Sequence, residues 1–149
     1  MRRHILASLF AVAFVAPALA QPTLSAPDKV AIFKAAGFKL QAGKYTRCPD
    51  DTAPSHTFGA IEAIDLNGDG AAEALVRETS TYCYGNTEQA TVVLGRDKAG
   101  AWKILLDQVG MDAVEKTKAN GWLNITIGGP GMGTQPLFKY NGAKYVLAR

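Results

Sequence analysis

From Thr57 onward the sequence consists of short segments rich in β-branched and aromatic residues, separated by clusters of Gly, Asn and Asp. Segments of this kind, bounded by turn residues, predict β-strands. In the segment 122–127, Leu123, Ile125 and Ile127 alternate with polar positions, so one face of that strand is expected to contact the core. The predicted strands are Phe58–Ile64, Glu73–Thr81, Gln89–Arg96, Trp102–Leu106, Trp122–Ile127, Gln135–Tyr140 and Lys144–Leu147. Their short connections favour an antiparallel meander.

One amphipathic helix precedes these strands. It is predicted to open at Ala26-Pro27-Asp28, with Asp28 satisfying free backbone N–H groups, and to end at Gly37. Residues 38–45 are ambiguous, residues 48–55 are expected to form a loop, and residues 111–119 are expected to form a short helix or an irregular loop. Asn141-Gly142 predicts a two-residue hairpin turn. The predicted fold class is therefore α+β, with the N-terminal helix packed on a mostly antiparallel β-meander sheet of six or seven strands.

The first 20 residues have the order of a secretory signal peptide. Arg2 and Arg3 precede an apolar run, and Ala18-Leu19-Ala20 offers small residues at the cleavage positions. We expect residues 1–20 to be removed and residues 21–149 to form a single globular domain, periplasmic or secreted. Because Gln21 is not a cysteine, no lipid anchor is expected, and no later segment is long enough for a membrane anchor.

Loss of the two arginines lowers the formal net charge from +3 to +1. The remaining Lys and Arg residues are scattered singly, without a basic stripe among aromatics. The sequence therefore argues against nucleic acid as a partner.

The sequence holds two cysteines, Cys48 and Cys83, and both follow the predicted signal peptide. An even number of cysteines in an oxidising compartment predicts a disulfide. The alternative is a pair of free thiols. The bridge would attach the Pro/Asp-rich segment that begins at Cys48 to the end of the strand near Tyr82.

The segment 64–76 is the one stretch whose spacing indicates a metal. Asp65, Asn67 and Asp69 alternate along a turn closed by Gly70, and short oxygen side chains arranged in this way suit Ca²⁺. An EF-hand is excluded, because Val76 stands where such a loop needs a bidentate Glu and because strands flank the segment. The alternative is a metal-free tight turn, since Asp and Asn side chains also bond their own backbone.

The same segment resembles the calcium loop of FG-GAP and VCBS-type repeats, in which D-x-[DN]-x-D-G-x-x-[DE] joins adjacent strands of a propeller blade. The resemblance implies calcium as a cofactor. The implied ligands are Asp65, Asn67, Asp69, the Ala71 backbone and Glu73. Those families repeat the unit several times and this chain has it once, so a whole propeller is not expected. A bound ion would act as a structural staple.

Catalytic patterns are weak. The one histidine after the signal peptide, His56, lies in a Ser/Pro-rich loop. Its sequence neighbour Ser55 does not have the geometry of a catalytic dyad with it, and we expect His56 to be solvated. Glu62, Glu78 and Glu88 lie on or beside strands and are expected to be surface charges. A carboxylate-based cell-wall or carbohydrate enzyme stays an alternative, and it would require two carboxyl groups facing each other in a cleft.

Two loops are candidates for a recognition edge. One is the glycine-rich stretch 128–133, and the other is the segment 82–86 around Cys83. Their candidate contact residues are Tyr82, Tyr84, Asn86 and Met132. Our first hypothesis is an exported binding or interaction module, not an enzyme, that contacts an unknown protein or envelope component. A second hypothesis is an inhibitor of an extracytoplasmic enzyme such as lysozyme, and a third is a purely structural accessory subunit.

Overall fold

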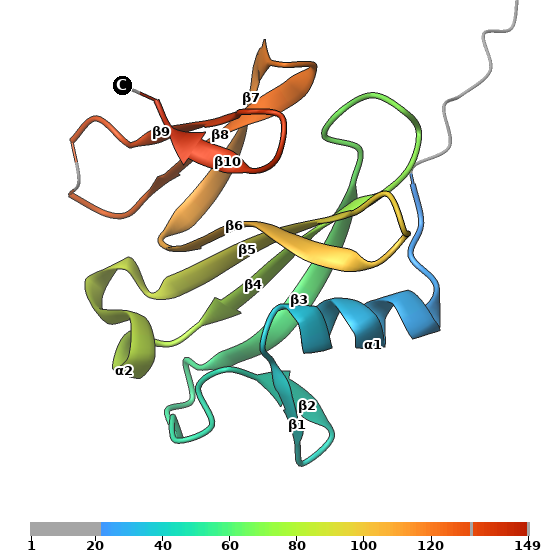
Figure 1. Cartoon of the computed structure of the whole chain (residues 1–149). Coiled ribbons are helices and arrows are strands. Elements are labelled where there is room, and N and C mark those ends of the chain that lie inside the picture. The colour runs from blue at the N-terminus through green and yellow to red at the C-terminus, as the bar shows by residue number, and fades with distance from the viewer. Residues whose placement is uncertain (1–21, 132, 149) are drawn as a thin grey trace, which may run out of the picture.

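In the computed structural model, which describes residues 22–131 and 133–148, the chain folds into three antiparallel sheets and two short α-helices (Figure 1). One sheet has the strand order β3-β4-β5-β6, a second has the order β10-β9-β8-β7, and β1 and β2 form a separate hairpin. Each four-stranded sheet is a meander of consecutive strands. The elements are α1 (Ala26–Ala35), β1 (Lys39–Gln41), β2 (Lys44–Thr46), β3 (Thr57–Ile64), β4 (Glu73–Thr79), α2 (Thr81–Tyr84), the 3-10 helix η1 (Gly85–Thr87), β5 (Gln89–Arg96), β6 (Trp102–Val109), β7 (Met111–Ala119), β8 (Trp122–Gly128), β9 (Leu137–Tyr140) and β10 (Tyr145–Leu147).

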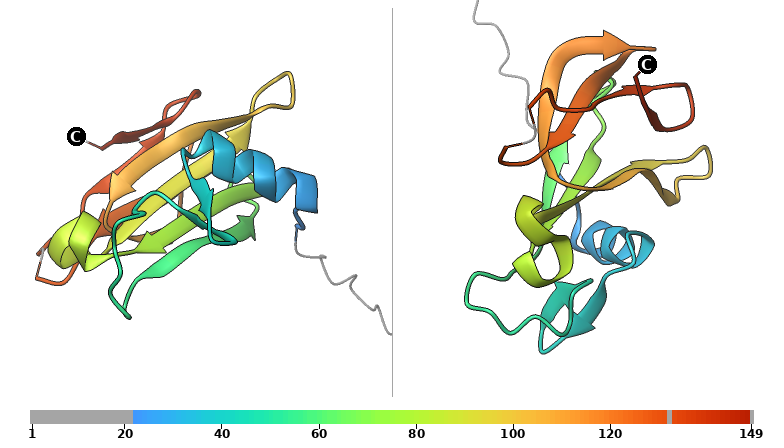
Figure 2. Two further views of the ribbon diagram at one scale, coloured as in Figure 1. Left: turned by 90° about the horizontal axis from the view of Figure 1, so that it is seen from below. Right: turned by 90° about the vertical axis from the view of Figure 1, so that its left-hand side faces the viewer.

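The sheet β3–β6 forms the middle layer of the molecule, as Figure 2 shows. The side chains of β4 alternate between its two faces. Leu75 packs with Ile125 and Phe138 of the β7–β10 sheet, whereas Val76 packs with Ile32 and Phe33 of α1. Two separate cores therefore cover the two faces of β4 and β5, which explains why consecutive apolar residues are buried in each strand, at positions 74–76 of β4 and 92–94 of β5.

Gly110 separates the two large sheets, because β6 ends at Val109 and β7 begins at Met111. Its φ is +144°, and a Cβ there would lie 2.6 Å from Ile127 Cγ2. A bidentate ion pair also joins the sheets, since Arg77 of β4 donates to both carboxylate oxygens of Asp112 over 2.6 Å. Glycine at position 110 thus allows the chain to pass directly from one sheet into the other.

The predicted strand positions are largely confirmed, but the predicted single sheet is two sheets and a hairpin. The expectation of a helix or loop at residues 111–119 is wrong, because this stretch forms β7 and pairs with β8 from Met111↔Gly128 to Ala119↔Trp122. A bulge between Val114 and Lys118 breaks the alternation of side chains in the register. For this reason the sequence at residues 111–119 lacks the regular apolar and polar alternation that would predict a strand.

Helix α1 is confirmed, and Asp28 satisfies a backbone N–H group as expected, although it is not the N-cap. Ser25 is the N-cap, its hydroxyl accepts from the Asp28 N–H, and the Asp28 carboxylate accepts from the Ser25 N–H in return. Asp28 is therefore the third helical residue of a capping box. The helix ends at Ala35, before Gly37, whose φ of +80° stops it.

The predicted two-residue hairpin at Asn141-Gly142 is wrong in detail. Tyr140 pairs with Tyr145, which leaves residues 141–144 in the loop. The Asn141 side-chain oxygen accepts from the N–H groups of Ala143 and Lys144, and Gly142 has a φ of +101°. The Asn side chain thus stabilises a longer loop by bonding its own backbone.

Candidate functional site

The predicted recognition segment forms a compact corner at the end of β4. Helix α2 begins after Ser80, whose hydroxyl accepts from the Cys83 N–H over 3.0 Å. The chain then turns back into β5 through Gly85 and Glu88, which both have positive φ, and the Ser80 N–H donates to the Glu88 carbonyl. We call residues 80–88, together with the adjoining Gly129–Gly131 segment, the α2 corner.

The disulfide between Cys48 and Cys83 is confirmed, and it attaches the α2 corner to the segment that follows β2. Cys48 is fully buried beneath this corner. Nearby, the Ser80 hydroxyl donates to Asp51 over 2.7 Å, and this hydrogen bond, followed by one from the Ala53 N–H, lowers the pKa of Asp51. The covalent bond and these hydrogen bonds hold the segment 48–53 against the corner.

A buried carboxylate lies at the centre of this region. Glu78 has no exposed surface, and it accepts hydrogen bonds from the Thr46 hydroxyl (2.5 Å), the Arg47 N–H (3.1 Å) and the Tyr84 hydroxyl (2.5 Å). Burial first, and then the hydrogen bond to Glu78, raise the pKa of Tyr84 far above its usual range. One carboxylate thus connects β2, β4 and α2.

His56 completes this cluster, and the expectation that it is a solvated loop residue is wrong. It is only 9% exposed, its Nε2 lies 3.2 Å from Glu78 Oε1, and its Nδ1 lies 3.1 Å from the Asp51 carbonyl oxygen. The ring also packs against Phe58. Both ring nitrogens thus lie within hydrogen-bond distance of oxygen atoms, one on each side of the ring.

The expectation that Glu78 is a surface charge is also wrong, because this side chain has no exposed surface. Its neighbours Arg77 and Thr79 suggest an exposed strand, and the groups that bury it, Thr46 and His56, lie 32 and 22 residues away in sequence. No local signal predicts such a cluster, because its members meet only after the hairpin and the loop 47–56 fold over β4.

The two predicted recognition loops meet in the structure. A Cβ on Gly129, in the connection between β8 and β9, would lie 2.9 Å from Thr87 Cγ2 and 3.3 Å from the Thr87 Cα. Figure 2 shows this connection and α2 at the same end of the molecule. Glycine at position 129 therefore permits close packing of the two segments that form the α2 corner.

The four predicted contact residues have different environments. Tyr82 is 72% exposed and Asn86 is exposed, whereas the Tyr84 hydroxyl points inward to Glu78. Met132 lies outside the described residues. The α2 corner thus presents one aromatic side chain to solvent on a base that a disulfide and a buried carboxylate hold in place.

The predicted metal loop lies at the opposite end of β4. The carboxylate of Asp65 accepts from the N–H groups of Gly68 (2.6 Å) and Gly70 (2.9 Å), and Asp69 Oδ1 accepts from the Ala71 N–H (2.7 Å). Leu66 is fully buried, and its carbonyl accepts from the Leu123 N–H of β8. The hydrogen bond from Leu123 fixes the loop against the second sheet. The hydrogen bonds that Asp65 and Asp69 accept are bonds from side chain to nearby backbone, as expected for the metal-free turn.

Glu73 is the buried acidic group of this loop. Its Oε2 accepts from the Leu66 N–H over 2.8 Å, and Asn67 Nδ2 lies 3.4 Å from its Oε1 and 3.0 Å from Asp69 Oδ2. Burial, together with the negative charges of Asp69 and Asp65, raises the pKa of Glu73 to about 7. The ionised form of Glu73 is therefore disfavoured in the folded loop, mainly because the side chain is buried.

The donor set of the loop fits calcium in its chemistry, but the side chains do not converge on one point. Within residues 22–131 and 133–148, no three acidic, His or Cys side chains gather closely enough to hold a metal ion. The Asn67 amide nitrogen lies between Asp69 and Glu73, where a cation would be expected. Binding would require this amide to turn its oxygen inward.

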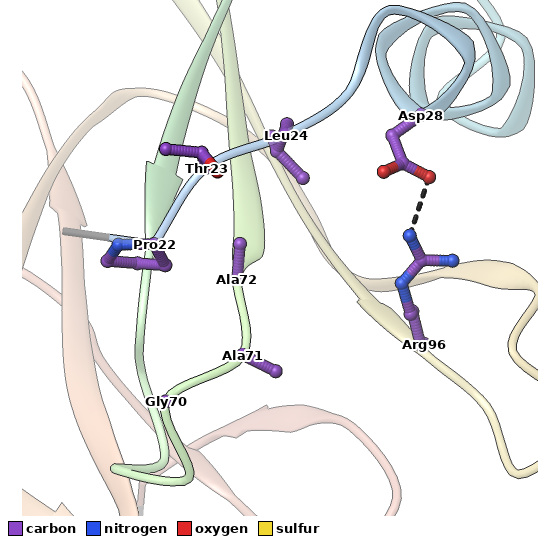
Figure 3. Close-up of a pocket in the computed structure, with 8 residues that line it drawn as sticks. All are labelled: Pro22, Thr23, Leu24, Asp28, Gly70, Ala71, Ala72 and Arg96. Atoms are coloured by element: carbon purple, nitrogen blue, oxygen red, sulfur yellow. Dashed lines mark hydrogen bonds and ion pairs between the residues drawn. The ribbon is translucent and has the colours of Figure 1, made fainter. Parts of the chain in front are cut away.

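A cavity of about 430 Å³ lies behind the loop (Figure 3). The chain from Pro22 to Leu24 and the turn from Gly70 to Ala72 line it, and the ion pair between Arg96 and Asp28 (2.5 Å) stands at its side. Hydrogen bonds from Ser25, first, and from Arg96 lower the pKa of Asp28 to about 2. Because the two charges at the cavity neutralise each other, it offers no unpaired charge to a ligand.

The carboxylates considered for an enzyme line none of the four main clefts of the described residues. Glu78 is sealed inside its cluster, Glu62 accepts from Arg77 over 2.5 Å, and Glu88 is exposed after η1. Glu78 cannot reach a substrate while the α2 corner is folded, so it cannot serve in a carboxylate pair.

No protein-family model, curated protein or solved structure matches the chain. Among the described residues, no helix is long and apolar enough to cross a bilayer.

Proposed function

We propose that this chain is an exported, non-enzymatic binding module that presents the α2 corner to a partner protein or another envelope component. The observation that carries the proposal is Tyr82, 72% exposed beside a disulfide-linked cysteine. Tyrosine supplies a large contact area at a small cost in side-chain entropy, and a rigid base reduces the entropy lost on binding. The disulfide supports export, because such bonds persist in oxidising compartments.

The rigidity of the corner is the second support for this proposal. An exposed four-residue helix is not stable alone, yet α2 has a side-chain cap, a disulfide and the Tyr84–Glu78 hydrogen bond within one turn. A chain that needed this segment only as a connection between β4 and β5 would not require so many restraints. Asn86 and the Gly129–Gly131 segment extend the same surface.

Site-specific photo-crosslinking tests the proposal. A photoreactive phenylalanine analogue replaces Tyr82 in one variant and Val30, which is 53% exposed on α1, in a matched control. We expect a discrete adduct from position 82 in envelope preparations. The parent protein should compete it away, whereas the Tyr82→Ala, Asn86→Ala variant should not. Equal labelling from both positions, or none from position 82, contradicts the proposal.

If the partner of the α2 corner is an extracytoplasmic enzyme, the protein should act as its inhibitor, and this can be assayed directly. The parent protein and the Tyr82→Ala variant are added to lysozyme acting on a cell-wall suspension. Inhibition by the parent that is lost in the variant would identify the partner as this enzyme. Absence of inhibition leaves the crosslinking result to decide the wider proposal.

We also propose that the loop 65–73 binds calcium as a structural ion, through Asp65, Asn67, Asp69, the Ala71 carbonyl and Glu73. The support is the buried carboxyl group of Glu73, whose raised pKa shows that its ionised form lacks stabilisation that a cation would supply, and the loop's position between two neighbouring strands of a meander. Titration calorimetry with Ca²⁺ tests this, with Asp69→Asn as the variant and Asp97→Asn, in the exposed β5–β6 turn, as the control. Absence of heat with the parent contradicts it.

A further inference from the structure

A groove of about 450 Å³ runs between the outer edges of β6 and β10, which Figure 1 shows beside each other. Neither edge is paired with another strand among the described residues, because β6 pairs only with β5 and β10 only with β9. Unpaired strand edges carry free backbone N–H and C=O groups, which can pair with an added strand. The groove therefore lies along two available edges.

Consecutive residues of both strands line this groove. The lining includes residues 104–108 of β6, the three residues of β10 and the preceding Lys144, together with Phe138. Since successive side chains of a strand point to opposite faces, a surface lined by every residue in turn is a surface along the backbone edge. An occupant of the groove thus meets main-chain groups as well as side chains.

Apolar and polar residues both line the groove, which is partly open to solvent. Leu105, Leu106 and Tyr145 form its buried floor, while Ile104 is 42% and Leu147 is 55% exposed. An extended chain with apolar side chains on one face would cover them.

The charged residues that line the groove indicate which charge a bound chain should carry. Its two charged lining residues are Asp107 and Lys144. Both oxygens of Asp107 accept from Arg47 over 3.0 Å, so this charge is already neutralised. Lys144 has no ion-pair partner within the described part of the chain. The remaining charge is positive and complements an acidic partner.

We propose that the groove between β6 and β10 binds an extended acidic segment of a partner protein, whose backbone pairs with the free edge of β6 and whose alternate apolar side chains fill the groove. This is strand addition, in which main-chain hydrogen bonds supply affinity and side-chain pockets supply specificity. The surface is separate from the α2 corner, so the two proposals can fail independently.

Nuclear magnetic resonance of the ¹⁵N-labelled protein tests the inference. The probe is a blocked synthetic peptide as long as β6, eight residues, with valine at alternate positions and glutamate and threonine between them. One control peptide is N-methylated at alternate amides, which removes the donors needed for strand pairing. Another control has lysine in place of glutamate.

We expect saturable shift changes and slowed amide exchange along β6 and at residues 144–147, with the glutamate peptide only. Lys144→Glu should weaken its binding by about fivefold, the range of an exposed ion pair, at an unchanged melting temperature. Tyr82→Ala should bind the peptide as the parent does, which separates this surface from the α2 corner.

Three outcomes overturn the inference. The first is no saturable binding of the glutamate peptide. The second is equal binding of the N-methylated peptide, or shift changes located elsewhere. The third is a protein that is dimeric without peptide and whose β6 amides are already protected from exchange, since a second copy would then occupy the edge.

Discussion

The Tyr84 hydroxyl donates to the buried carboxylate of Glu78 over 2.5 Å, and this contact ties the four-residue helix α2 to β4. Tyr84 lies two residues from Tyr82, which is 72% exposed. The two tyrosines of one short helix thus have opposite roles, since one anchors the corner and the other is presented to solvent.

Removal of one hydroxyl should distinguish these roles. In Tyr84→Phe, Glu78 loses a donor in a buried site, and we expect the free energy of unfolding to fall by about 1 to 3 kcal/mol. Tyr82→Phe is the matched control and should change it by less than about 0.5 kcal/mol, because its hydroxyl is at the surface. Urea denaturation measures both. Equal effects would mean that the Tyr84–Glu78 contact does not stabilise the corner.

Replacement of Glu78 itself should be more severe. In Glu78→Ala, the Thr46 and Tyr84 hydroxyls, the Arg47 N–H and His56 all lose their acceptor inside the protein. Breaking such a buried cluster costs about 3 to 5 kcal/mol. Glu88→Ala, at an exposed position, is the control. A melting temperature of Glu78→Ala equal to that of the parent would contradict the assignment of Glu78 as the centre of the cluster.

The disulfide should contribute a comparable amount. It closes a loop of 35 residues, for which the chain-entropy estimate is about 3 to 4 kcal/mol. Because Cys48 and Cys83 are the only cysteines of the sequence, a reducing agent acts on this bond alone. The melting temperature should fall with reductant in the parent and stay constant in the Cys48→Ala, Cys83→Ala variant. A parent melting curve that reductant leaves unchanged is the opposing result.

The strands could be predicted from sequence because their signals are local. Turn residues separate them, and alternation identified the core face of β8, where Ile125 and Ile127 are buried. Their division into two sheets could not be predicted, since Gly110 alone marks the boundary and no cluster of turn residues surrounds it. Strand β7 was missed for a related reason. Its bulge disturbs the alternation, and pairing with β8 determines its conformation.

The disulfide could be predicted because two cysteines allow one pairing. The polar cluster around Glu78 could not, since burial of a charged side chain depends on donors that the fold brings from distant positions. His56 illustrates the difficulty, because its immediate neighbours are polar and its partner Glu78 lies 22 residues further along the chain. Glu73 was found by its place in a spaced motif, although the motif does not reveal that the side chain is buried.

The raised pKa of Glu73 should make the protein less stable as the pH rises, which is opposite to the effect of a carboxylate whose pKa is lowered by folding. Its pKa is about 7 in the folded protein against 4.5 as the ordinary value, so the folded state binds more protons between these two pH values. The free energy of unfolding should therefore be greatest at the acidic end of this window. It should fall by about 2 to 3 kcal/mol as the pH rises to 7, at about 1.4 kcal/mol for each pKa unit.

Denaturation in chelator-containing buffer across this pH window measures the effect. Glu73→Gln keeps the size of the side chain but cannot ionise, so the decline in stability should be much shallower in this variant. Saturating Ca²⁺ should also remove most of the decline in the parent, because a bound cation stabilises the ionised carboxylate. A parent and a variant with the same slope would show that the Glu73 carboxylate does not titrate in this window.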